Sequence, residues 1–218
     1  MSARATLRLG TRGSELARTQ SGTIAAALER LGFPCELTII KTSGDQNTTS
    51  TFASIGPQGV FVREIEQALV ETRIELAVHS FKDLPTKSPA DLTIAAVPAR
   101  VDPADLLLAR SDALAAAGDD WLPLKAGARV GTASARRRAW LKHFRPDLAV
   151  EPLRGNVPTR IAKLEQESLD AVVLACAGLD RLGLAGEISE RISPDVLLPA
   201  VCQGTPIPEL RTTILSWP

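Results

Sequence analysis

The stretch "FVREIEQALVETRIELAVHSFKDLPT", residues 61–86, decides the fold class. Phe61, Ile65 and Leu69 recur every four residues, and this spacing predicts a helix with one apolar face. The next residues, "IELAVHS" at 74–80, predict a short buried strand that runs into a polar turn. A helix that leads directly into a buried strand is the repeating unit of an α/β fold.

The same alternation continues on both sides of this stretch. Before it, strands are predicted over residues 6–11 and 35–43, with a helix over 15–32 between them. After it, a second series has strands over 128–134, 148–155 and 169–178, and helices over 136–144 and 159–168. Short apolar strands that alternate with amphipathic helices favour mainly parallel sheets with helices on both faces.

We therefore expect an α/β protein of two lobes, joined by two crossings and separated by a hinged cleft. Pro98 and Pro103 mark the first crossing. Residues 1–98 form the predicted first lobe, to which the tail 199–218 returns, and residues 99–198 form the predicted second lobe.

The composition limits the possible partners. The chain of 218 residues has 25 basic and 25 acidic side chains, so no net charge draws it to nucleic acid or to an anionic membrane. Aromatic residues make up only 4%, which disfavours stacking on single-stranded nucleic acid. No run approaches the ~20 apolar residues that cross a bilayer, and the first ten residues lack the apolar core of a secretory signal. We expect a soluble, cytoplasmic protein.

The cysteines and histidines form no recognisable metal-binding or disulfide pattern. Cys35, Cys176 and Cys202 are widely spaced and odd in number, which fits neither a disulfide framework nor a paired zinc motif. The two histidines, His79 and His143, are too few for a histidine-rich centre, so we expect no metal. Each cysteine is expected to be a small buried apolar residue.

Arginines gather at the turns that follow predicted strands, and in an α/β sheet this carboxyl edge binds ligands. The turns are "GTRGSEL" with Arg12 and Ser14, "GTASARRRAW" with Ser134, Arg136 and Arg137, "LRGNVPTR" with Arg154 and Arg160, and "AGLDRLG" with Arg181. Helix N-termini and guanidinium groups both bind anions. Any one of these residues could belong to a solvated surface, but four such turns favour a cleft for a polyanion. No P-loop, dinucleotide-binding turn or hydrolase elbow motif is present.

Five segments resemble the porphobilinogen deaminase (hydroxymethylbilane synthase) family in order and spacing. They are "RLGTRGSELA", "GVFVREIEQALVETRIELAVHSFKDLPT", "VGTASARRRA", "LRGNVPTRIAKL" and "AGLDRLGL", and the match covers residues 6–204. The resemblance implies two periplasmic-binding-protein-like lobes and a third, smaller domain. It also implies a monomeric transferase of porphyrin and haem biosynthesis, which joins four porphobilinogen molecules head to tail on a dipyrromethane cofactor, releases ammonia and makes a linear tetrapyrrole.

The resemblance further implies roles for individual residues. Asp83 matches the family's catalytic aspartate, which would handle pyrrole N–H protons and stabilise the cation left when ammonia departs. The residues expected to bind cofactor and substrate are Arg12, Ser14, Ser80, Lys82, Ser134, Arg136, Arg137, Arg154, Arg160, Arg181 and Gln203. Each porphobilinogen brings two carboxylates, so a cleft with many arginines suits the growing chain. His79 is expected to be structural.

The sequence departs from the family at two places that bear on activity. Gln58 stands where the family commonly has a lysine, in the lid region. After Gly204 the chain continues as "TPIPELRTTILSWP", and Pro206 and Pro208 are expected to make a poor central strand because neither has a ladder donor. We expect the third domain, whose cysteine carries dipyrromethane, to be absent, so that no cysteine here is the attachment site. Its loss would expose apolar surface.

Three hypotheses follow from these features. The first is a transferase of the deaminase family that depends on Asp83. The second is a binding module, in which two lobes close on a carboxylate-rich ligand without turnover. The third is an inactive, truncated or frame-shifted product of the same family.

Overall fold

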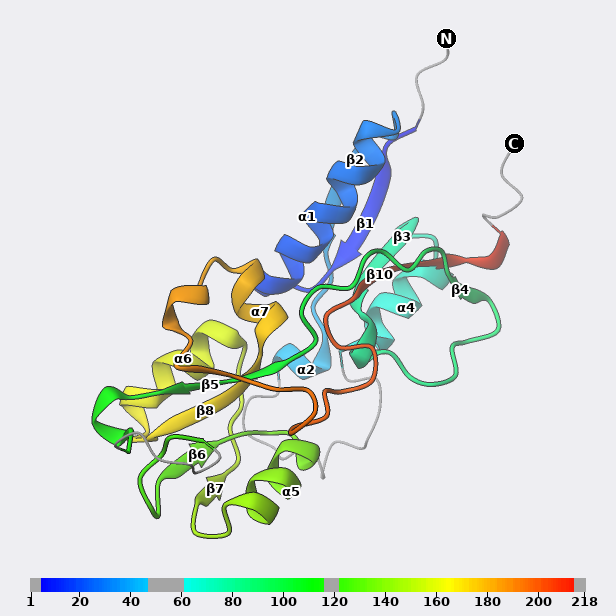
Figure 1. Cartoon of the computed structure of the whole chain (residues 1–218). Coiled ribbons are helices and arrows are strands. Elements are labelled where there is room, and N and C mark those ends of the chain that lie inside the picture. The colour runs from blue at the N-terminus through cyan, green and yellow to red at the C-terminus, as the bar shows by residue number, and fades with distance from the viewer. Residues whose placement is uncertain (1–4, 47–60, 116–121, 214–218) are drawn as a thin grey trace. The chain divides into compact units, whose positions relative to one another are not determined.

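A computed structural model describes residues 5–46, 61–115 and 122–213 of the chain (Figure 1). The chain forms two compact units, of which unit 1 comprises Met1–Arg100 with Thr205–Pro218 and unit 2 comprises Val101–Gly204. Two boundaries therefore differ from those expected: residues 199–204 belong to the second unit, and residues 99–100 belong to the first. Gln58 lies outside the described residues.

Unit 1 is built on a five-stranded sheet with the order β2-β1-β3-β10-β4. Its elements are β1 Leu7–Thr11, α1 Glu15–Arg30, β2 Cys35–Ile39, α2 Ser43–Gln46, α4 Arg63–Val70, β3 Leu76–Ser80, the 3₁₀ turn η1 Phe81–Asp83, β4 Leu92–Ile94 and β10 Pro206–Arg211. Strands β1, β2 and β3 are parallel, whereas β10 runs antiparallel to both β3 and β4.

The helices of unit 1 cover both faces of this sheet, as the alternation of side chains along β3 requires. Leu76 and Val78 of β3 pack with Ile24 of α1 on one face. Ala77, between them, packs with Ile65 of α4 on the other. The predicted helix stop is also present, because Gly32 adopts a φ of +82° and its N–H donates to the Glu29 carbonyl (2.9 Å).

Unit 2 has a second five-stranded sheet, with the order β7-β6-β8-β5-β9. Its elements are β5 Asp105–Ala109, the 3₁₀ turn η2 Ser111–Ala113, β6 Arg129–Gly131, α5 Ala135–Phe144, β7 Ala149–Glu151, α6 Val157–Gln166, β8 Ala171–Ala175, α7 Cys176–Arg181, the 3₁₀ turn η3 Ala185–Glu187 and β9 Glu190–Ile192. Here β6, β7 and β8 are parallel, and β5 runs antiparallel between β8 and β9.

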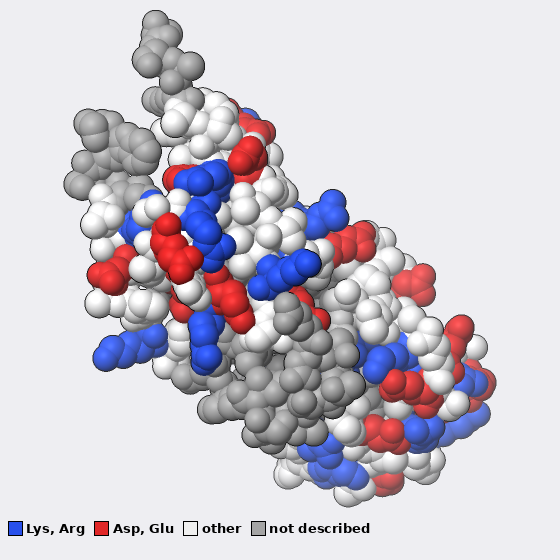
Figure 2. All heavy atoms as spheres, turned by 180° about the vertical axis from the view of Figure 1, so that it is seen from behind, with Lys and Arg blue, Asp and Glu red and all other residues white. Residues whose placement is uncertain are grey.

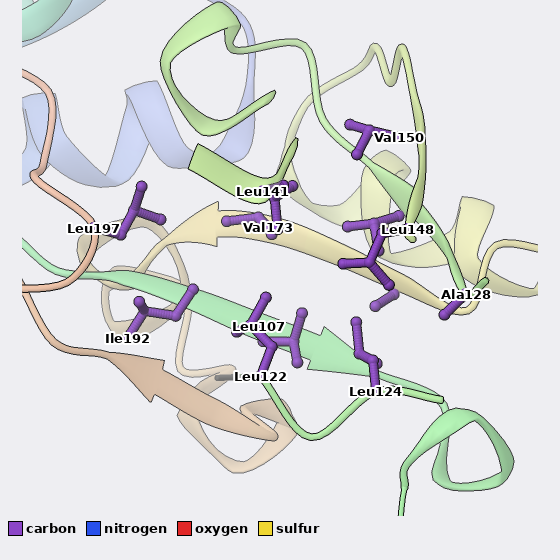
Figure 3. Packing of buried hydrophobic residues seen from close by; sticks show 12 residues of the cluster. Leu107, Leu122, Leu124, Ala128, Leu141, Leu148, Val150, Val173, Ile192 and Leu197 are labelled. Carbon is purple, nitrogen blue, oxygen red and sulfur yellow. The ribbon is translucent and has the colours of Figure 1, made fainter. Parts of the chain in front are cut away.

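Two apolar clusters hold the helices of unit 2 to its sheet. Leu141 of α5 faces Val173 of β8 and Leu107 of β5 on one side (Figure 3). Leu164 of α6 and Leu179 of α7 pack on the opposite side, against residues that alternate with the first set along the same strands.

The two sheets have the same plan. Each has three parallel strands, then one antiparallel strand, then a short edge strand. The antiparallel strand is the one next to a crossing: β5 is the first strand of unit 2, and β10 is the only described strand of unit 1 that follows unit 2 in the chain. The predicted α/β class with mainly parallel sheets is confirmed.

The expectation that Pro206 and Pro208 would make a poor central strand was wrong. Both lie in β10, which pairs with β3 on one side and β4 on the other. The Pro208 carbonyl accepts from Ala95 N (2.9 Å), so Pro208, and Pro206 two residues earlier, direct their missing donors toward the β4 side. β4 ends at Ile94, which pairs with Glu209. Both prolines therefore lie beyond the paired part of β4, and their missing N–H groups remove no hydrogen bond between β10 and β4.

One further boundary and the burial of two cysteines differ from the sequence prediction. The strand predicted over 169–178 ends at Ala175, and Cys176 instead begins α7, where it is fully buried. Cys35 and Cys202 are only half-buried, so the expectation of buried cysteines holds for Cys176 alone. Among the described residues, no helix is both long and apolar enough to cross a membrane.

Candidate functional site

The polar residues singled out from the sequence lie at one edge of each sheet. In unit 1, Arg12 follows β1 and Asp83 follows β3, both at the carboxyl ends of parallel strands. In unit 2 the carboxyl ends of β6, β7 and β8 lead to the other three arginine turns. On the described parts of the face that Figure 2 shows, Lys and Arg lie beside Asp and Glu, so positive charge is not segregated there.

Arg12 is held by two contacts in unit 1. Its Nη2 lies 2.5 Å from Asp45 Oδ1, and its guanidinium lies 4.0 Å from the centre of the Phe61 ring. Burial raises the pKa of Asp45, but the hydrogen bonds and charge of Arg12, with a bond from Thr42, outweigh burial and lower it overall. Arg12 therefore presents a fixed cation that is about a quarter exposed.

A small pocket lies next to Arg12 at the end of β3. Its lining residues are Arg12, Ala17, Gln20, Phe61, Val62, Val78, His79, Ser80 and Asp83. Ser80 exchanges hydrogen bonds with the Gln20 side chain at 3.1 and 3.2 Å, which fixes one wall. Lys82 and Asp83 are both exposed in η1, so the Asp83 carboxylate is accessible at the rim.

Ser14 has a local role in this arrangement. It is the N-cap of α1, and its Oγ accepts from Ala17 N at 3.4 Å. The cap orients the first turn of α1, which contributes Ala17 and Gln20 to the pocket wall.

His79 faces away from Ser80, because neighbouring residues of a strand point to opposite sides of the sheet. Its Nε2 lies 3.4 Å from Glu209 Oε2 on β10, and both side chains are almost wholly buried. Burial and the nearby Glu209 carboxylate raise the pKa of Glu66 on α4, against smaller opposing effects of His79 and Arg63. His79 thus packs against Glu209 as well as lining the pocket, and no hydrogen bond joins the two side chains.

In unit 2 the N-terminus of α5 forms the most highly connected part of the site. Ser134 is the N-cap, and its Oγ accepts from Arg137 N at 3.4 Å. Arg136 Nη2 donates to Asp105 Oδ2 (2.6 Å), and Arg137 Nη2 donates to Asp105 Oδ1 (2.7 Å). Gln203 Nε2 donates to the same Oδ1 at 2.8 Å. One fully buried carboxylate therefore gathers three of the residues predicted or implied for binding.

The charge state of this cluster follows from its contacts. Burial raises the pKa of Asp105, but the charge and hydrogen bond of Arg137, with bonds from Gln203 and Arg136, outweigh burial and lower it. Arg137 is buried and also donates to the Val173 carbonyl (2.9 Å), whereas the Arg136 side chain is 24% exposed. Arg136 is thus the member of the pair that can meet a ligand in this conformation.

The remaining predicted arginines each have local partners. Arg160 Nε donates to the Gly155 carbonyl (2.7 Å), next to half-buried Arg154 in the turn before α6. Arg181 Nη2 donates to the Gly204 carbonyl (2.8 Å), and burial lowers the pKa of Arg181. Arg154 and Arg160 follow β7, and Arg181 follows β8, so both groups lie at the same edge of the unit 2 sheet.

Sequence reasoning missed Asp105, Gln20 and Glu209. Asp105 carried a usable signal, because an aspartate at the head of the apolar run "LLLA" is a charge placed at the start of a buried strand. Gln20 and Glu209 gave no such signal in the sequence, since each is a single polar residue whose partner lies far away along the chain.

Comparison with known proteins identifies the family. Residues 7–213 match the model described as porphobilinogen deaminase, dipyromethane cofactor binding domain. The chain belongs to the porphobilinogen deaminase family. The match runs past Gly204, where we expected the sequence to depart, and includes all of β10.

Curated porphobilinogen deaminases are similar to most of the chain. That of Micrococcus luteus is 50% identical, covering 94% of this chain and 57% of its own length. That of Syntrophus aciditrophicus is 47% identical, covering 94% and 66%, and that of a Roseiflexus species is 50% identical, covering 91% and 64%. The chain therefore spans about six tenths of the length of these family members.

Solved structures agree on the fold. The periplasmic VFT2 domain of BvgS from Bordetella pertussis superposes with a TM-score of 0.53 at 12% identity, covering 95% of this chain and 81% of that chain. The likeness concerns fold alone, and it confirms the two-lobed, periplasmic-binding-protein-like architecture that the deaminase family resemblance implied.

The deaminase family cofactor, dipyrromethane, fits part of the described site. In each unit taken by itself, its carboxylates match an arginine side chain at a strand end that is fixed and partly exposed, Arg12 in unit 1 and Arg136 in unit 2. Neither Cys176 nor Cys35 suits a thioether anchor. Cys176 is fully buried with its pKa raised to about 11 by burial, and Cys35 begins β2, at the sheet edge opposite Arg12.

Proposed function

We propose that the chain provides the two substrate-binding lobes of a hydroxymethylbilane synthase, which joins four porphobilinogen molecules head to tail with release of ammonia. The observation that carries this proposal is the exposed Asp83 carboxylate beside Arg12 in one pocket of a deaminase family member. A carboxylate next to a fixed guanidinium suits a substrate that carries acid groups and develops positive charge.

The arginine turns would recognise the acid groups of porphobilinogen and of the growing chain. Arginine forks bind carboxylates with two parallel hydrogen bonds, and a helix N-terminus adds free N–H donors. Arg12 and Lys82 would serve in unit 1, and Arg136, Arg154, Arg160 and Arg181 in unit 2. Ser80, already paired with Gln20, would offer a further hydrogen bond at the pocket.

Asp83 would act on the reacting porphobilinogen. The C–N bond of the protonated aminomethyl group breaks with its electron pair on nitrogen, which leaves as ammonia. The carbon stays cationic until a pyrrole carbon attacks it, and that pyrrole carbon then loses its proton. A carboxylate accepts hydrogen bonds from pyrrole N–H and stabilises such a cation. Its place on η1, anchored between β3 and Pro85, keeps the carboxylate at the rim.

When bound, dipyrromethane supplies the pyrrole to which the first substrate is joined. The residues of this chain that would hold it are the arginines above, through its acid groups, with Ser134 orienting the α5 N-terminus. Cys35 and Cys176 do not suit the anchor, so intact mass after incubation with porphobilinogen tests Cys202, which is half-buried. We expect no stable added mass, and an added mass of two pyrrole units would show that Cys202 carries the cofactor.

The test of the proposal is ammonia release from porphobilinogen by the wild type and by Asp83→Asn. Loss of a group that stabilises charge in the transition state typically costs ~100-fold or more in rate, so we expect at least that decrease. The control is Asp91→Asn, since Asp91 is an exposed aspartate of unit 1 away from the pocket. Equal turnover by Asp83→Asn and wild type would contradict the role of Asp83.

A binding module is the second candidate. The observation that favours it is the set of fixed, partly exposed guanidinium groups such as Arg136, because these bind a carboxylate without any need for turnover. Titration calorimetry with porphobilinogen separates the two candidates, because binding without ammonia release supports the module. Absence of both binding and release would exclude both.

A further inference from the structure

Asp105 is the first residue of β5 and pairs with Ala175, the last residue of β8. It therefore lies at the carboxyl edge of the parallel strands, although its own strand runs antiparallel. Its side chain is wholly buried there. A buried carboxylate at a ligand-binding edge requires an explanation, since an ionised carboxylate is costly to bury without partners.

The partners of Asp105 are divided between its two oxygens. Oδ1 accepts from Arg137 (2.7 Å) and Gln203 (2.8 Å), and Oδ2 accepts from Arg136 (2.6 Å). One negative and two positive charges leave the cluster with an excess of one positive charge. Because Arg137 is buried and Arg136 is 24% exposed, this excess is presented to solvent through Arg136.

The position of Arg136 is fixed from two sides. Its Nη2 is held by Asp105, and its Nη1 donates to the Leu198 carbonyl. An arginine with one edge fixed in this way loses less side-chain freedom when its outer edge binds an anion, which favours affinity. The N-cap of α5 at Ser134 places free helix N–H groups beside it.

We propose that Asp105 is a positioning residue of the carboxylate-binding site. It orients Arg136 at the N-terminus of α5, and Arg137 serves as its buried counter-charge rather than as a ligand contact in this conformation. This inference deepens the proposed function and rests on it, because the ligand is a carboxylate-bearing pyrrole. The claim that Asp105 immobilises Arg136 does not depend on that function.

Gln203 extends the same arrangement to the chain segments that enter and leave unit 2. Its Nε2 donates to the Pro103 carbonyl (2.7 Å) as well as to Asp105. Residue 103 lies just after the start of unit 2 and residue 203 just before its end. Asp105 therefore fixes Arg136 relative to both segments, not only to the neighbouring strand.

The experiment compares three variants of the whole chain with the wild type. Asp105→Asn removes the charge, and Asp105→Glu keeps it but moves the carboxylate by one methylene. Asp147→Asn is the matched control. Asp147 accepts two bonds from Arg145 at 2.8 Å in the same unit, but it precedes β7 and so lies away from the carboxyl edge.

Two readouts are made on each variant. The first is the order of the Arg136 side chain, from relaxation of its Nε signal in nuclear magnetic resonance. We expect it to fall in both Asp105 variants and to stay unchanged in Asp147→Asn. The second is the dissociation constant for porphobilinogen, which we expect to rise about tenfold in the Asp105 variants, the effect of losing one charge-assisted hydrogen bond. It should stay within about twofold in Asp147→Asn, where no such bond faces the ligand.

The outcomes separate this inference from the proposed function. If wild type does not bind porphobilinogen, the proposed function fails, while the order of Arg136 still decides whether Asp105 positions it. If Asp105→Asn does not fold, Asp105→Glu supplies both readouts, because it keeps a negative charge against buried Arg137 while the displaced carboxylate loses its bond geometry to Arg136. An equally ordered Arg136 in wild type and Asp105→Glu, or a Kd that changes as much in Asp147→Asn, would overturn the inference.

Discussion

Asp105 shows how one residue combines stability with site geometry. Its partners hold its pKa below the ordinary value of 3.8, so folding favours its ionised form. Removing one member of a buried ion pair leaves the other charge uncompensated and typically costs ~3–5 kcal/mol. A residue that supports a binding site in this way cannot be changed without some effect on folding.

The pH dependence of Asp105→Asn tests this statement. For a group with a lowered folded pKa, the stabilisation is present above the unfolded pKa and is lost as pH falls through the folded pKa. We expect the stability difference from wild type to be largest at pH 7 and to shrink steadily below about pH 4. Urea unfolding at pH 7 and at pH 3 measures both values. A difference that grows toward low pH would contradict the assignment.

Glu66 is the opposite case. Its pKa is raised by burial and by Glu209, and its Oε1 is buried with no hydrogen-bond partner among the described residues. The charged form of Glu66 is therefore disfavoured in the folded state. The stabilisation that comes from its protonated form is lost as pH rises through the folded pKa. We expect Glu66→Gln to raise the melting temperature at pH 7 and to change it less at pH 4. Glu71→Gln is the control, because Glu71 is exposed on the same unit.

At the scale of elements, the caps and turns of the sequence had direct structural meaning. Asn156 caps α6, and its Oδ1 accepts from both the N–H (2.9 Å) and the hydroxyl (2.7 Å) of Thr159. Loss of such a cap typically costs ~1 kcal/mol. We expect Asn156→Ala to lose about this much in urea unfolding and Asn156→Asp to retain most of it. Equal loss in both would point to a role other than capping.

Gly204 sets the turn that leads out of unit 2. It has a φ of +94°, and a Cβ there would lie 2.7 Å from the Val101 carbonyl oxygen, which is backbone and cannot move aside. Gly127 also has a positive φ, of +75°, but a Cβ there meets nothing within 4 Å. We expect Gly127→Ala to cost about 1 kcal/mol from backbone strain alone and Gly204→Ala to cost clearly more. Parallel thermal melts of the two variants check this difference.

The sequence predicted some elements and site residues well and others not at all. Elements with a regular apolar period, such as α4 with Ile65 and Leu69, were predicted within two or three residues. β10 was not, because the prolines signal against a strand unless the end of the neighbouring ladder is known. The arginine turns were found from local motifs. Asp105, the shared partner of Arg136 and Arg137, was missed because the pairing of residues so far apart in sequence is a property of the fold.

At the scale of the whole molecule, each unit has its own apolar core. Leu141 belongs to a cluster made only of unit 2 residues, and Leu69 belongs to one made only of unit 1 residues. Leu→Ala changes at such fully buried sites cost ~2–5 kcal/mol. We expect Leu141→Ala to weaken hydrogen-exchange protection first in β5, β6 and β8, and Leu69→Ala to weaken it first in β1 and β3. Uniform loss over the whole chain in both variants would show a single cooperative unit instead.

The position of β10 has a consequence for how the chain is made. β10 fills the place between β3 and β4, yet it is translated only after all of unit 2, whose residues are contiguous. At ~5–20 residues per second, the ribosome needs on the order of ten seconds between completing β3 and completing β10. During that interval unit 2 can fold while β3 keeps an unpaired edge, which is a template for wrong pairing. We therefore expect a chaperone to be needed more by nascent unit 1 than by unit 2.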